Sequence, residues 1–339
     1  MKGMILAAGF GTRLRPITWT LPKPMVPLCN RPLIGWAVES FLRSGVREIV
    51  VNLHHLPAAI EQYLQTSFAT RASFEFSVEE EILGTGGGIR RVRRLLEHDE
   101  EFYLVNADTV QFPRWAELSA ARQQRDSLAA LTLRHPPAGD RFTAVWLNHG
   151  LITGFGEGAG EPLMFAGSHA IGRRIFELLP DKEFSGIVDE VYRPAIAAGA
   201  ETLAGVVDDG LWFDVGTPQR LLGAVDGVLE ATLRAELEPA DGSEVRGNSI
   251  VHATARTTGS INRSTVGSNS VVEGSVTGSA VWDDCHVPAG SLLDRCVVAH
   301  GVTIPPGIEL RDAVICVDDS AIPHDDALER RDGLVIARF

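Results

Sequence analysis

Lysine is nearly absent from this chain. Of its 31 basic residues, only Lys2, Lys23 and Lys182 are lysines. Arginine therefore supplies the ordinary basic surface, and a lysine placed inside a motif carries more information than usual. Long apolar runs are also missing, since none reaches the roughly 18 residues that a membrane-spanning helix needs. The apolar stretch after Lys2 runs into a glycine turn after about five residues, which is too short for a signal peptide. We expect a cytoplasmic protein without a membrane partner.

Cysteine is scarce as well. The four cysteines, at positions 29, 285, 296 and 316, stand far apart and form no CxxC pair. This spacing predicts neither a zinc site nor a disulfide framework. We expect all four to be small, buried core residues.

Positive charge is in deficit, because the formal net charge is −13. A protein of this charge repels nucleic acid and anionic membranes unless a local basic patch intervenes. The densest basic run, RRVRR at residues 90–94, falls in a predicted helix and is interpreted as its solvated face. We therefore expect no nucleic-acid partner.

What the first half of the chain does contain is an alternation of strand and helix signals. Strands are predicted over residues 4–8, 48–52, 74–78, 102–105 and 211–215, and helices over 33–44, 57–64, 89–96 and 218–237. Such alternation predicts βαβ units, hence a Rossmann-like α/β domain with a mainly parallel, mixed sheet. Ligands of these sheets bind beyond the carboxyl ends of the strands.

The pattern changes after the predicted linker. With 339 residues the chain has room for two domains, predicted at 1–238 and 248–339 with a linker over 239–247. In the second, aliphatic residues recur at a spacing of six, at positions 281, 287, 293, 304 and 310, and Val298 is one residue out of phase. This period predicts a left-handed parallel β-helix. Residues 250–276 fit it less regularly, and a fragment of a β-sandwich is the alternative.

The most informative segment is LAAGFGTRLRPITWTLPKP, residues 6–24. Gly9 and Gly11 allow a sharp turn whose N–H groups can approach a phosphate. Thr12 adds a hydroxyl, and Arg13 adds a planar donor fork. Lys23 stands between two prolines, which restrict where its ammonium can go. The combination indicates a loop that handles phosphate groups.

Two better-known phosphate loops do not fit this segment. No Gly-Lys-Ser/Thr follows the glycines, so it is not a Walker A loop. Leu14 stands where the dinucleotide fingerprint has its third glycine, so GxGxxG is not complete either.

The segment resembles the signature of the nucleoside-diphosphate-sugar pyrophosphorylases, the sugar-1-phosphate nucleotidyltransferases. Four further motifs follow in the family's order: LGTGGGI at 83–89, LVNAD at 104–108, FAG at 165–167 and LWFDVGTPQRL at 211–221. The resemblance covers about residues 1–235. VNLHHL, LGTGGGI and LWFDVGTP are similar to the N-acetylmuramate-1-phosphate uridylyltransferase branch. An added hexapeptide domain is more typical of mannose-1-phosphate guanylyltransferases.

The resemblance implies that an NTP and a sugar-1-phosphate react to give an NDP-sugar and pyrophosphate. The attacking sugar phosphate is already an anion, so the reaction needs no general base. The protein has to align the reactants and neutralise charge at the α-phosphate. Mg²⁺ is the expected cofactor, and two aspartates suffice to hold it together with phosphate oxygens and water.

Four residues are assigned to the chemistry on this resemblance. Arg13 is expected at the leaving β- and γ-phosphates, and Lys23 at the α-phosphate and the sugar phosphate. Asp108 and Asp214 are the expected Mg²⁺ ligands. The alternatives are that Asp108 caps the following turn and that Asp214 is a buried carboxylate bonded to the turn at residues 216–217.

A wider set is assigned to binding. The nucleotide-binding residues are expected to be Leu6, Ala7, Ala8, Gly9, Gly11, Thr12, Arg13, Lys23, Glu79, Gly84, Thr85 and Gly86. The sugar-binding residues are expected to be Asn106, Phe165, Ala166 and Gly167. Glu79 stands evenly against a solvated acidic run, and the glycines from residue 84 stand against a flexible entrance to a helix. His54 and His55 are interpreted as turn residues without a chemical role.

The substrates stay open at this point. Between Arg134 and Leu151, RHPPAGDRFTAVWLN replaces the Asn-Pro stretch of the uridylyltransferase branch. The expected order of NTPs is UTP, GTP and dTTP, with N-acetylmuramate-1-phosphate or a hexose-1-phosphate as acceptor. Two other classes remain as alternatives: a catalytically inactive regulatory subunit, and an acyltransferase with His286 or His300 as base. Because flat β-helix faces pair readily between chains, a homo-oligomer is expected.

Overall fold

The computed structural model describes residues 1–137, 139, 142–199 and 202–339. Ala138, Asp140 and Arg141, from the segment that departs from the uridylyltransferase branch, lie outside the described residues. The chain forms two compact units, of which the first holds residues 1–9 and 34–212 and the second 10–33 and 213–339. The boundaries predicted along the chain, at 238 and 248, stay a prediction. None of the described helices combines the length and apolar character that crossing a membrane requires.

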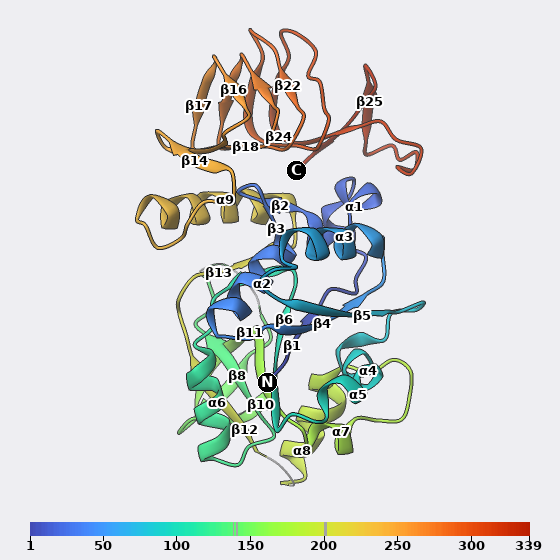
Figure 1. Cartoon of the computed structure of the whole chain (residues 1–339), viewed down its shortest axis with the longest axis vertical. Coiled ribbons are helices and arrows are strands. Elements are labelled where there is room, and N and C mark those ends of the chain that lie inside the picture. Colours follow the sequence, from blue (N-terminus) through green and yellow to red (C-terminus); the bar gives the residue numbers. More distant parts are fainter. Residues whose placement is uncertain (138, 140–141, 200–201) are drawn as a thin grey trace. The chain divides into compact units, whose positions relative to one another are not determined.

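The first unit is built on a mixed nine-stranded sheet (Figure 1). In spatial order its strands are β5 (Ser73–Val78), β4 (Glu48–Leu53), β1 (Gly3–Leu6), β6 (Glu101–Asn106), β11 (Glu161–Gly172), β8 (Ala129–Arg134), β12 (Leu203–Val207), β10 (Leu151–Phe155) and β9 (Val145–Asn148). The first four are parallel, and β11 runs antiparallel to both β6 and β8. The predicted α/β fold with a mixed sheet is confirmed, although β8 and β12 gave no signal that we interpreted.

Helices cover both faces of this sheet. They are α2 (Leu33–Arg43), α3 (Pro57–Ser67), α4 (Gly84–Arg91), α5 (Arg93–Leu96), α6 (Trp115–Gln124), α7 (Ile175–Leu178), the π-helical turn η3 (Val188–Tyr192) and α8 (Arg193–Ala197). The helices predicted at 33–44 and 57–64 are confirmed. The one predicted at 89–96 begins five residues earlier, at Gly84, and is interrupted at Val92. Arg91, Arg93 and Arg94 are exposed, as expected of a solvated helix face.

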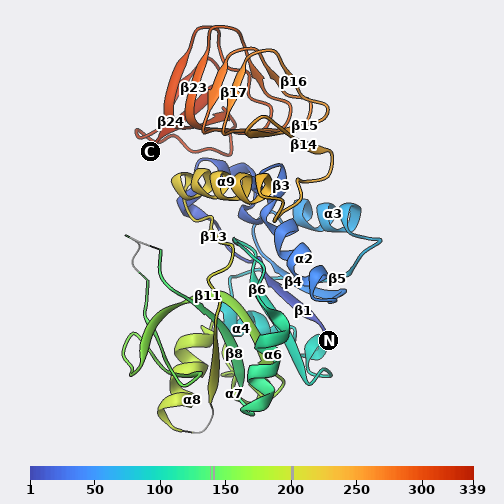
Figure 2. The same ribbon diagram turned by 90° about the vertical axis from the view of Figure 1, so that its left-hand side faces the viewer.

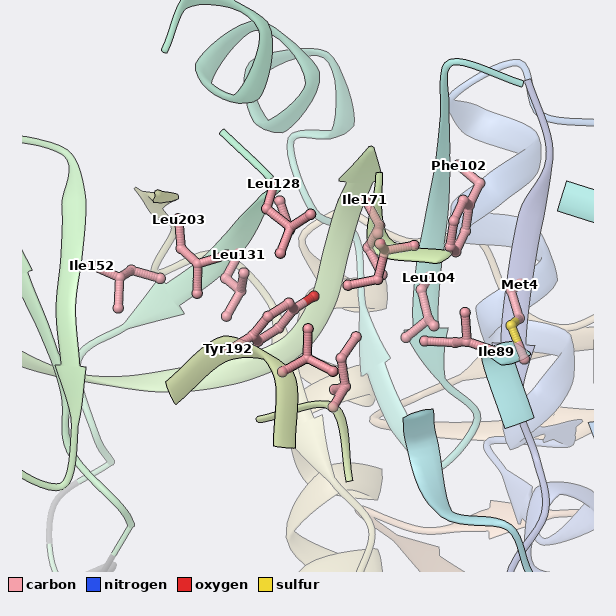
Figure 3. Close-up of a cluster of buried hydrophobic side chains, with 14 of the residues drawn as sticks. Met4, Ile89, Phe102, Leu104, Leu128, Leu131, Ile152, Ile171, Tyr192 and Leu203 are labelled. Atoms are coloured by element: carbon pink, nitrogen blue, oxygen red, sulfur yellow. The ribbon is translucent and has the colours of Figure 1, made fainter. Parts of the chain in front are cut away.

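Alternation along β6 shows how the two faces are divided. Phe102 and Leu104 point into a cluster that includes Ile89 of α4 and Tyr192 of η3 (Figure 3). Tyr103 points the other way and stacks on Trp115 of α6, with 4.6 Å between ring centroids. Successive side chains of a strand face opposite sides of the sheet. Because both sides are apolar here, β6 lies at the centre of the unit and its carboxyl end is held rigidly.

The second unit contains the later part of the signature segment. Its short elements are η1 (Thr12–Leu14), α1 (Ile17–Thr20), η2 (Lys23–Met25), β2 (Pro27–Leu28) and β3 (Arg31–Pro32). They are followed, far along the chain, by α9 (Pro218–Leu233), which begins as predicted with Thr217 as N-cap and proline in its first position. The helix ends four residues before the predicted Leu237.

The rest of this unit is a stack of short parallel strands (Figure 2). They are β14 (Ser243–Arg246), β15 (Ser249–His252), β16 (Arg256–Thr257), β17 (Ser260–Asn262), β18 (Thr265–Val266), β19 (Val271–Val272), β20 (Ser275–Thr277), β21 (Ala280–Val281), β22 (His286–Val287), β23 (Leu292–Val298), β24 (Glu309–Val317), β25 (Glu329–Arg331) and β26 (Leu334–Arg338). The parallel coils are consistent with the predicted left-handed β-helix. The last strands, β24 to β26, pair antiparallel.

The coils explain both irregularities of the sequence pattern. Val266 pairs with Val281, 15 residues on, whereas Val281 pairs with Val298, 17 residues on. A coil of 17 residues cannot consist of three six-residue sides, so one side is shorter and Val298 arrives one residue early. The 15-residue coils lose a further two residues, which is why residues 250–276 matched the six-residue period poorly. The β-sandwich alternative is wrong, because these strands stack in parallel.

A ladder of buried hydroxyl groups links the coils. The amide of Ser264 donates to Ser249 Oγ at 3.2 Å, and the amide of Ser279 donates to Ser264 Oγ at 3.1 Å. The amide of Cys296 continues the series on Ser279 Oγ at 2.8 Å. Each hydroxyl therefore satisfies a backbone donor that the coil geometry leaves without a carbonyl partner.

The cysteines are buried and form no disulfide, as expected. Cys285 and Cys296 occupy corner positions equivalent to those of the buried serines, and the Cys285 amide donates to Ser270 Oγ at 2.9 Å. Burial raises the pKa of the Cys285 thiol to about 12 and that of Cys296 to about 11. Both therefore stay protonated and unreactive at neutral pH.

Removing one rung of the ladder should destabilise the β-helix. Ser264→Ala leaves the buried amide of Ser279 without its acceptor, and we expect it to lower the free energy of unfolding by about 1–3 kcal/mol. Ser260→Ala, at an exposed position, is the control and should stay within about 0.5 kcal/mol. Urea unfolding followed by circular dichroism measures both. Equal midpoints for the two variants would contradict the role of the ladder.

Candidate functional site

The start of the signature segment is held by a buried hydrogen-bond relay. β1 ends at Leu6, and the amide of Ala7 donates to Asn52 Oδ1 at 2.9 Å. Asn52, at the end of β4, donates through Nδ2 to Glu79 Oε1 at 2.8 Å. The other carboxylate oxygen of Glu79 accepts the amide of Leu83 at 2.9 Å. Three segments of the chain, at the ends of β1, β4 and β5, are thus tied together.

Glu79 is therefore a different residue from the one its neighbours suggested. Its side chain is 2% exposed, whereas Glu80 and Glu81 are exposed, so the solvated acidic run does not include it. Both of its oxygens accept protein hydrogen bonds. In this geometry Glu79 positions two segments that are predicted to bind the nucleotide. Sequence reasoning missed Asn52, although a polar residue closing the apolar run EIVV was a usable signal.

His54 belongs to the same region. Its Nδ1 lies 2.9 Å from the carbonyl oxygen of Glu79. This contact braces the backbone on which the relay depends, and it agrees with the interpretation of His54 as a residue without a chemical role.

The glycines at residues 84–87 make room for another segment. A Cβ on Gly87 would lie 2.3 Å from the carbonyl oxygen of Glu183, and one on Gly86 would lie 2.6 Å from Ser185 Oγ. The Ser185 carbonyl in turn accepts the amide of Gly86 at 2.8 Å. These residues form the ordered first turn of α4, so the alternative of a flexible helix entrance is wrong. Thr85, between them, is half-buried.

The predicted sugar-side residues lie close together in the first unit. Gly167, with φ of 93°, packs so closely on Asn106 that a Cβ would lie 3.0 Å from Asn106 Nδ2. The neighbouring Ala166 carbonyl accepts from Trp212 Nε1 at 2.9 Å and from Gln111 Nε2 at 3.1 Å. Sequence reasoning named neither of these two donors.

Phe165 stands at the start of the irregular part of β11. Its pairing with Leu133 is followed by a register shift that ends at His169. The strand thus bends at Ala166 and Gly167, and the Phe165 side chain stays half-buried. A bend of this kind is a common way to aim side chains at a site.

Asp108 follows β6 directly and lies beside the signature segment. The amide of Ala107 donates to the Leu6 carbonyl at 2.9 Å, which fixes the backbone that carries Asp108 next to the end of β1. The Asp108 side chain is partly exposed and its Oδ1 accepts from Thr109 Oγ1 at 3.3 Å.

In the second unit, Gly11 and Lys23 are built against each other. Gly11 has φ of 61°, and a Cβ there would lie 2.8 Å from Cβ of Lys23. The Gly11 carbonyl accepts both the Leu14 amide and Thr18 Oγ1, each at 2.9 Å. The Lys23 side chain is 9% exposed at the start of η2. The glycine turn and the proline-flanked lysine therefore form one structural element.

Arg13 and Asp214 lie in the same unit. The exposed Arg13 guanidinium covers Gly216, where a Cβ would lie 3.0 Å from an Arg13 Nη atom. Asp214 forms an ion pair with Arg220 of α9 through Oδ2. Its predicted alternative partner, the turn at residues 216–217, is not the one observed. The Thr217 hydroxyl instead accepts the Arg220 amide at 3.3 Å.

The described residues suit a metal that takes few protein ligands. Among them, no three His, Cys, Asp or Glu side chains gather as a metal site would require. A closed structural site for zinc is therefore not built from them. Mg²⁺ takes one or two carboxylates and fills its remaining positions with phosphate oxygens and water. Asp214 keeps Oδ1 for such a role while Arg220 holds Oδ2.

The predicted site residues are thus distributed over both units. The first contains Leu6, Ala7, Ala8, Gly9, Glu79, Gly84, Thr85, Gly86, Asn106, Asp108, Phe165, Ala166 and Gly167, and the second Gly11, Thr12, Arg13, Lys23 and Asp214. Within each unit the residues are held by short, specific contacts. The joint use of Asp108 and Asp214 stays a prediction.

Gly87→Ala should test the close approach at α4. With a Cβ 2.3 Å from a backbone oxygen, the segment at 183–185 must move, and we expect a loss of about 1–3 kcal/mol in the free energy of unfolding. Gly223→Ala is the matched control, because this exposed glycine of α9 has nothing within 4 Å of its Cβ position. It should stabilise the protein by up to about 1 kcal/mol. Thermal unfolding compares the two, and a neutral Gly87→Ala would refute the packing argument.

Comparison with known proteins agrees with this geometry. The family model described as nucleotidyl transferase matches residues 2–231, and the model described as GlmU-like, C-terminal hexapeptide matches residues 247–326. A probable mannose-1-phosphate guanylyltransferase 3 of Oryza sativa subsp. japonica is 29% identical over 93% of this chain and 86% of its own length. The mannose-1-phosphate guanyltransferase of Hypocrea jecorina is 31% identical over 76% of this chain and 73% of its own.

A solved structure shares the fold of the first two thirds of the chain. HddC from Yersinia pseudotuberculosis, complexed with GMP-PN, superposes with a TM-score of 0.56 at 20% identity. The match covers 67% of this chain and 99% of HddC. The nucleotidyl transferase model alone accounts for well over half of the sequence. The chain therefore belongs to the nucleotidyl transferase family and carries a GlmU-like hexapeptide domain at its C-terminal end.

Proposed function

We propose that this nucleotidyltransferase transfers GMP from GTP to mannose-1-phosphate, giving GDP-mannose and pyrophosphate. The observation that carries the proposal is the extent of the similarity to relatives named mannose-1-phosphate guanylyltransferase, which runs over 93% of this chain and includes the hexapeptide domain. The sequence motifs alone placed UTP first. The names of the relatives move GTP and mannose-1-phosphate ahead of UTP and N-acetylmuramate-1-phosphate.

Charge neutralisation by Arg13 and Lys23 is the core of the proposed mechanism. Lys23 is 9% exposed, and a nearly buried ammonium is stable only beside anionic or hydrogen-bonding groups. An α-phosphate supplies such a group. Arg13 is exposed and can donate two parallel hydrogen bonds to the departing phosphates. Neither residue has to take up a proton, because the acceptor phosphate attacks as an anion.

Sugar nucleotidyltransferases generally use a divalent metal, and we propose Mg²⁺ with Asp108 and Asp214 as its protein ligands. The ion supplies neutralisation of the phosphate oxygens as charge develops. Arg220 has a positioning role in this proposal. By pairing with Oδ2 of Asp214 it keeps the carboxylate ionised and fixes its orientation.

The remaining residues bind and orient the substrates in this proposal. The backbone from Leu6 to Gly9, Gly11 with Thr12, and the turn at residues 84–86 contact the nucleotide. Asn106 and the bend of β11 at Phe165–Gly167 contact the sugar. The close packing of Gly167 on Asn106 supports this grouping.

We propose the chain's organisation in the same terms. Residues 1–238 act as the catalytic domain, 239–247 as a linker and 248–339 as an assembly domain that forms a homo-oligomer. The protein acts in the cytoplasm, where its substrates are made.

Asp108→Asn tests the metal assignment. Removing one preorganised charge should lower kcat at least ~10²-fold. Asp326→Asn, at an exposed position of the C-terminal segment, should keep the wild-type rate. Pyrophosphate release under saturating Mg²⁺ is the measurement. Wild-type activity in Asp108→Asn would refute the assignment.

A substrate matrix tests the proposed reaction itself. Four NTPs are combined with mannose-, glucose-, N-acetylglucosamine- and N-acetylmuramate-1-phosphate, with pyrophosphate release as the readout. We expect the highest kcat/KM for GTP with mannose-1-phosphate. A preference for UTP with N-acetylmuramate-1-phosphate would transfer the chain to the other branch. No turnover in any combination would favour a regulatory subunit, and an acetyl-CoA-dependent reaction lost in His300→Ala would favour an acyltransferase.

A further inference from the structure

His135 forms an unusual contact at the end of β8. Its Nδ1 lies 2.8 Å from Asp209 Oδ2, and its Nε2 lies 3.0 Å from Glu161 Oε1. Its backbone amide also donates to Asp209 Oδ1 at 2.9 Å. One side chain thus connects three segments: the end of β8, the start of β11 and the turn that follows β12.

That turn, residues 208–212, is held to β8 by neighbouring contacts as well. The Asp208 amide donates to the Leu133 carbonyl at 2.8 Å, and Arg134 donates through Nη1 to the Gly210 carbonyl at 3.1 Å. The Arg134 guanidinium also lies over the Trp212 ring, 5.1 Å from its centroid. The end of β8 therefore determines where the turn, and Trp212 within it, is placed.

Trp212 connects the turn to the predicted sugar side. Its Nε1 donates to the Ala166 carbonyl at 2.9 Å, at the bend of β11 that also contains Gly167. The sequence then reaches Asp214 two residues later. A shift of the turn would therefore displace a residue that contacts the sugar side directly.

We propose that His135 is a positioning residue for the sugar-1-phosphate, acting by clamping the 208–212 turn to β8 and β11 and so fixing Trp212 against Ala166. The inference rests on the proposed function for the identity of the ligand. The clamp itself is independent of it.

The clamp requires a particular protonation state. Both of its partners are carboxylates that accept hydrogen bonds, so both ring nitrogens of His135 must carry a proton. The hydrogen bond to Asp209, followed by the one to Glu161, raises the pKa of His135 above its usual 6.5. Arg134 is the other charged group in this surrounding and, with His135, it lowers the pKa of Asp209.

The direction of the pH dependence follows from this shift. Because the pKa of His135 is raised in the folded protein, the clamp is complete below pH 6.5 and weakens as the pH rises through the folded pKa. Deprotonation leaves one N–H for two carboxylates. The side chain of His135 is 58% exposed, so water screens the contact and its effect is modest.

The test uses three variants of the full chain. His135→Gln cannot donate to both carboxylates. His135→Arg can do so at any pH and serves as the conservative rescue. His324→Gln, at an exposed histidine of the C-terminal segment, is the matched control. Circular dichroism and thermal unfolding first establish that all three are folded.

The first readout needs no substrate. Hydrogen exchange, measured by mass spectrometry on peptides covering residues 203–212 at pH 6 and pH 8, reports on the turn. After correction for intrinsic rates, we expect His135→Gln to exchange about two- to fivefold faster than wild type at pH 6 and no faster at pH 8. His135→Arg should be protected at both pH values. Unchanged exchange in His135→Gln would overturn the clamp.

The second readout uses the transferase reaction. In His135→Gln, KM for the sugar-1-phosphate should rise about two- to fivefold, with little change in kcat or in KM for the NTP. His135→Arg should restore the wild-type KM and remove its rise toward pH 8. Faster exchange with an unchanged sugar-1-phosphate KM would overturn the positioning role while leaving the clamp. Absence of any transferase activity in wild type would refute the proposed function, and hydrogen exchange would still decide on the clamp.

Discussion

The buried relay from Ala7 through Asn52 to Glu79 and Leu83 is the contact on which the first unit's site depends. Two of its members are polar side chains with exposures of 3% and 2%. Such groups are costly unless every hydrogen bond is made, and a fully satisfied network in a low-dielectric interior is correspondingly rigid. The relay fixes the relative positions of the strand ends at β1, β4 and β5. The rigidity that charge neutralisation at a phosphate requires is thereby supplied by hydrogen bonds rather than by a metal or a disulfide.

Close backbone approach is the second constraint. Gly11 against Lys23, Gly167 against Asn106 and Gly87 against Glu183 each leave less space than a Cβ needs. Their glycines act as points of contact, not as sources of flexibility. The same principle operates in the β-helix, where small buried serines and cysteines at the coil corners accept backbone amides. In both units, the smallest side chains occur where the backbone has to be placed most exactly.

Much of the architecture was predictable because it rests on local periodicity. The strands and helices of the first hundred residues followed from alternating apolar patterns, and Thr217-Pro218 correctly predicted the start of α9. The start of α4 did not, since glycine is the second-poorest helix former and only tertiary contact with residues 183–185 makes it helical there. The 15- and 17-residue coils also exceeded what a search for sixes could resolve.

The sequence by itself determined the reaction class, because Gly11, Arg13, Lys23 and the later motifs keep a fixed order that phosphate chemistry requires. It also determined the two kinds of fold, through the periods of βαβ units and of stacked coils. Only the tertiary structure decided that Glu79 is a buried support, that Asp214 pairs with Arg220, and that His135 joins three segments of the sugar side. The physical reason is that these roles depend on partners 4 to 75 residues away, and a contact between distant residues leaves no local pattern in the sequence.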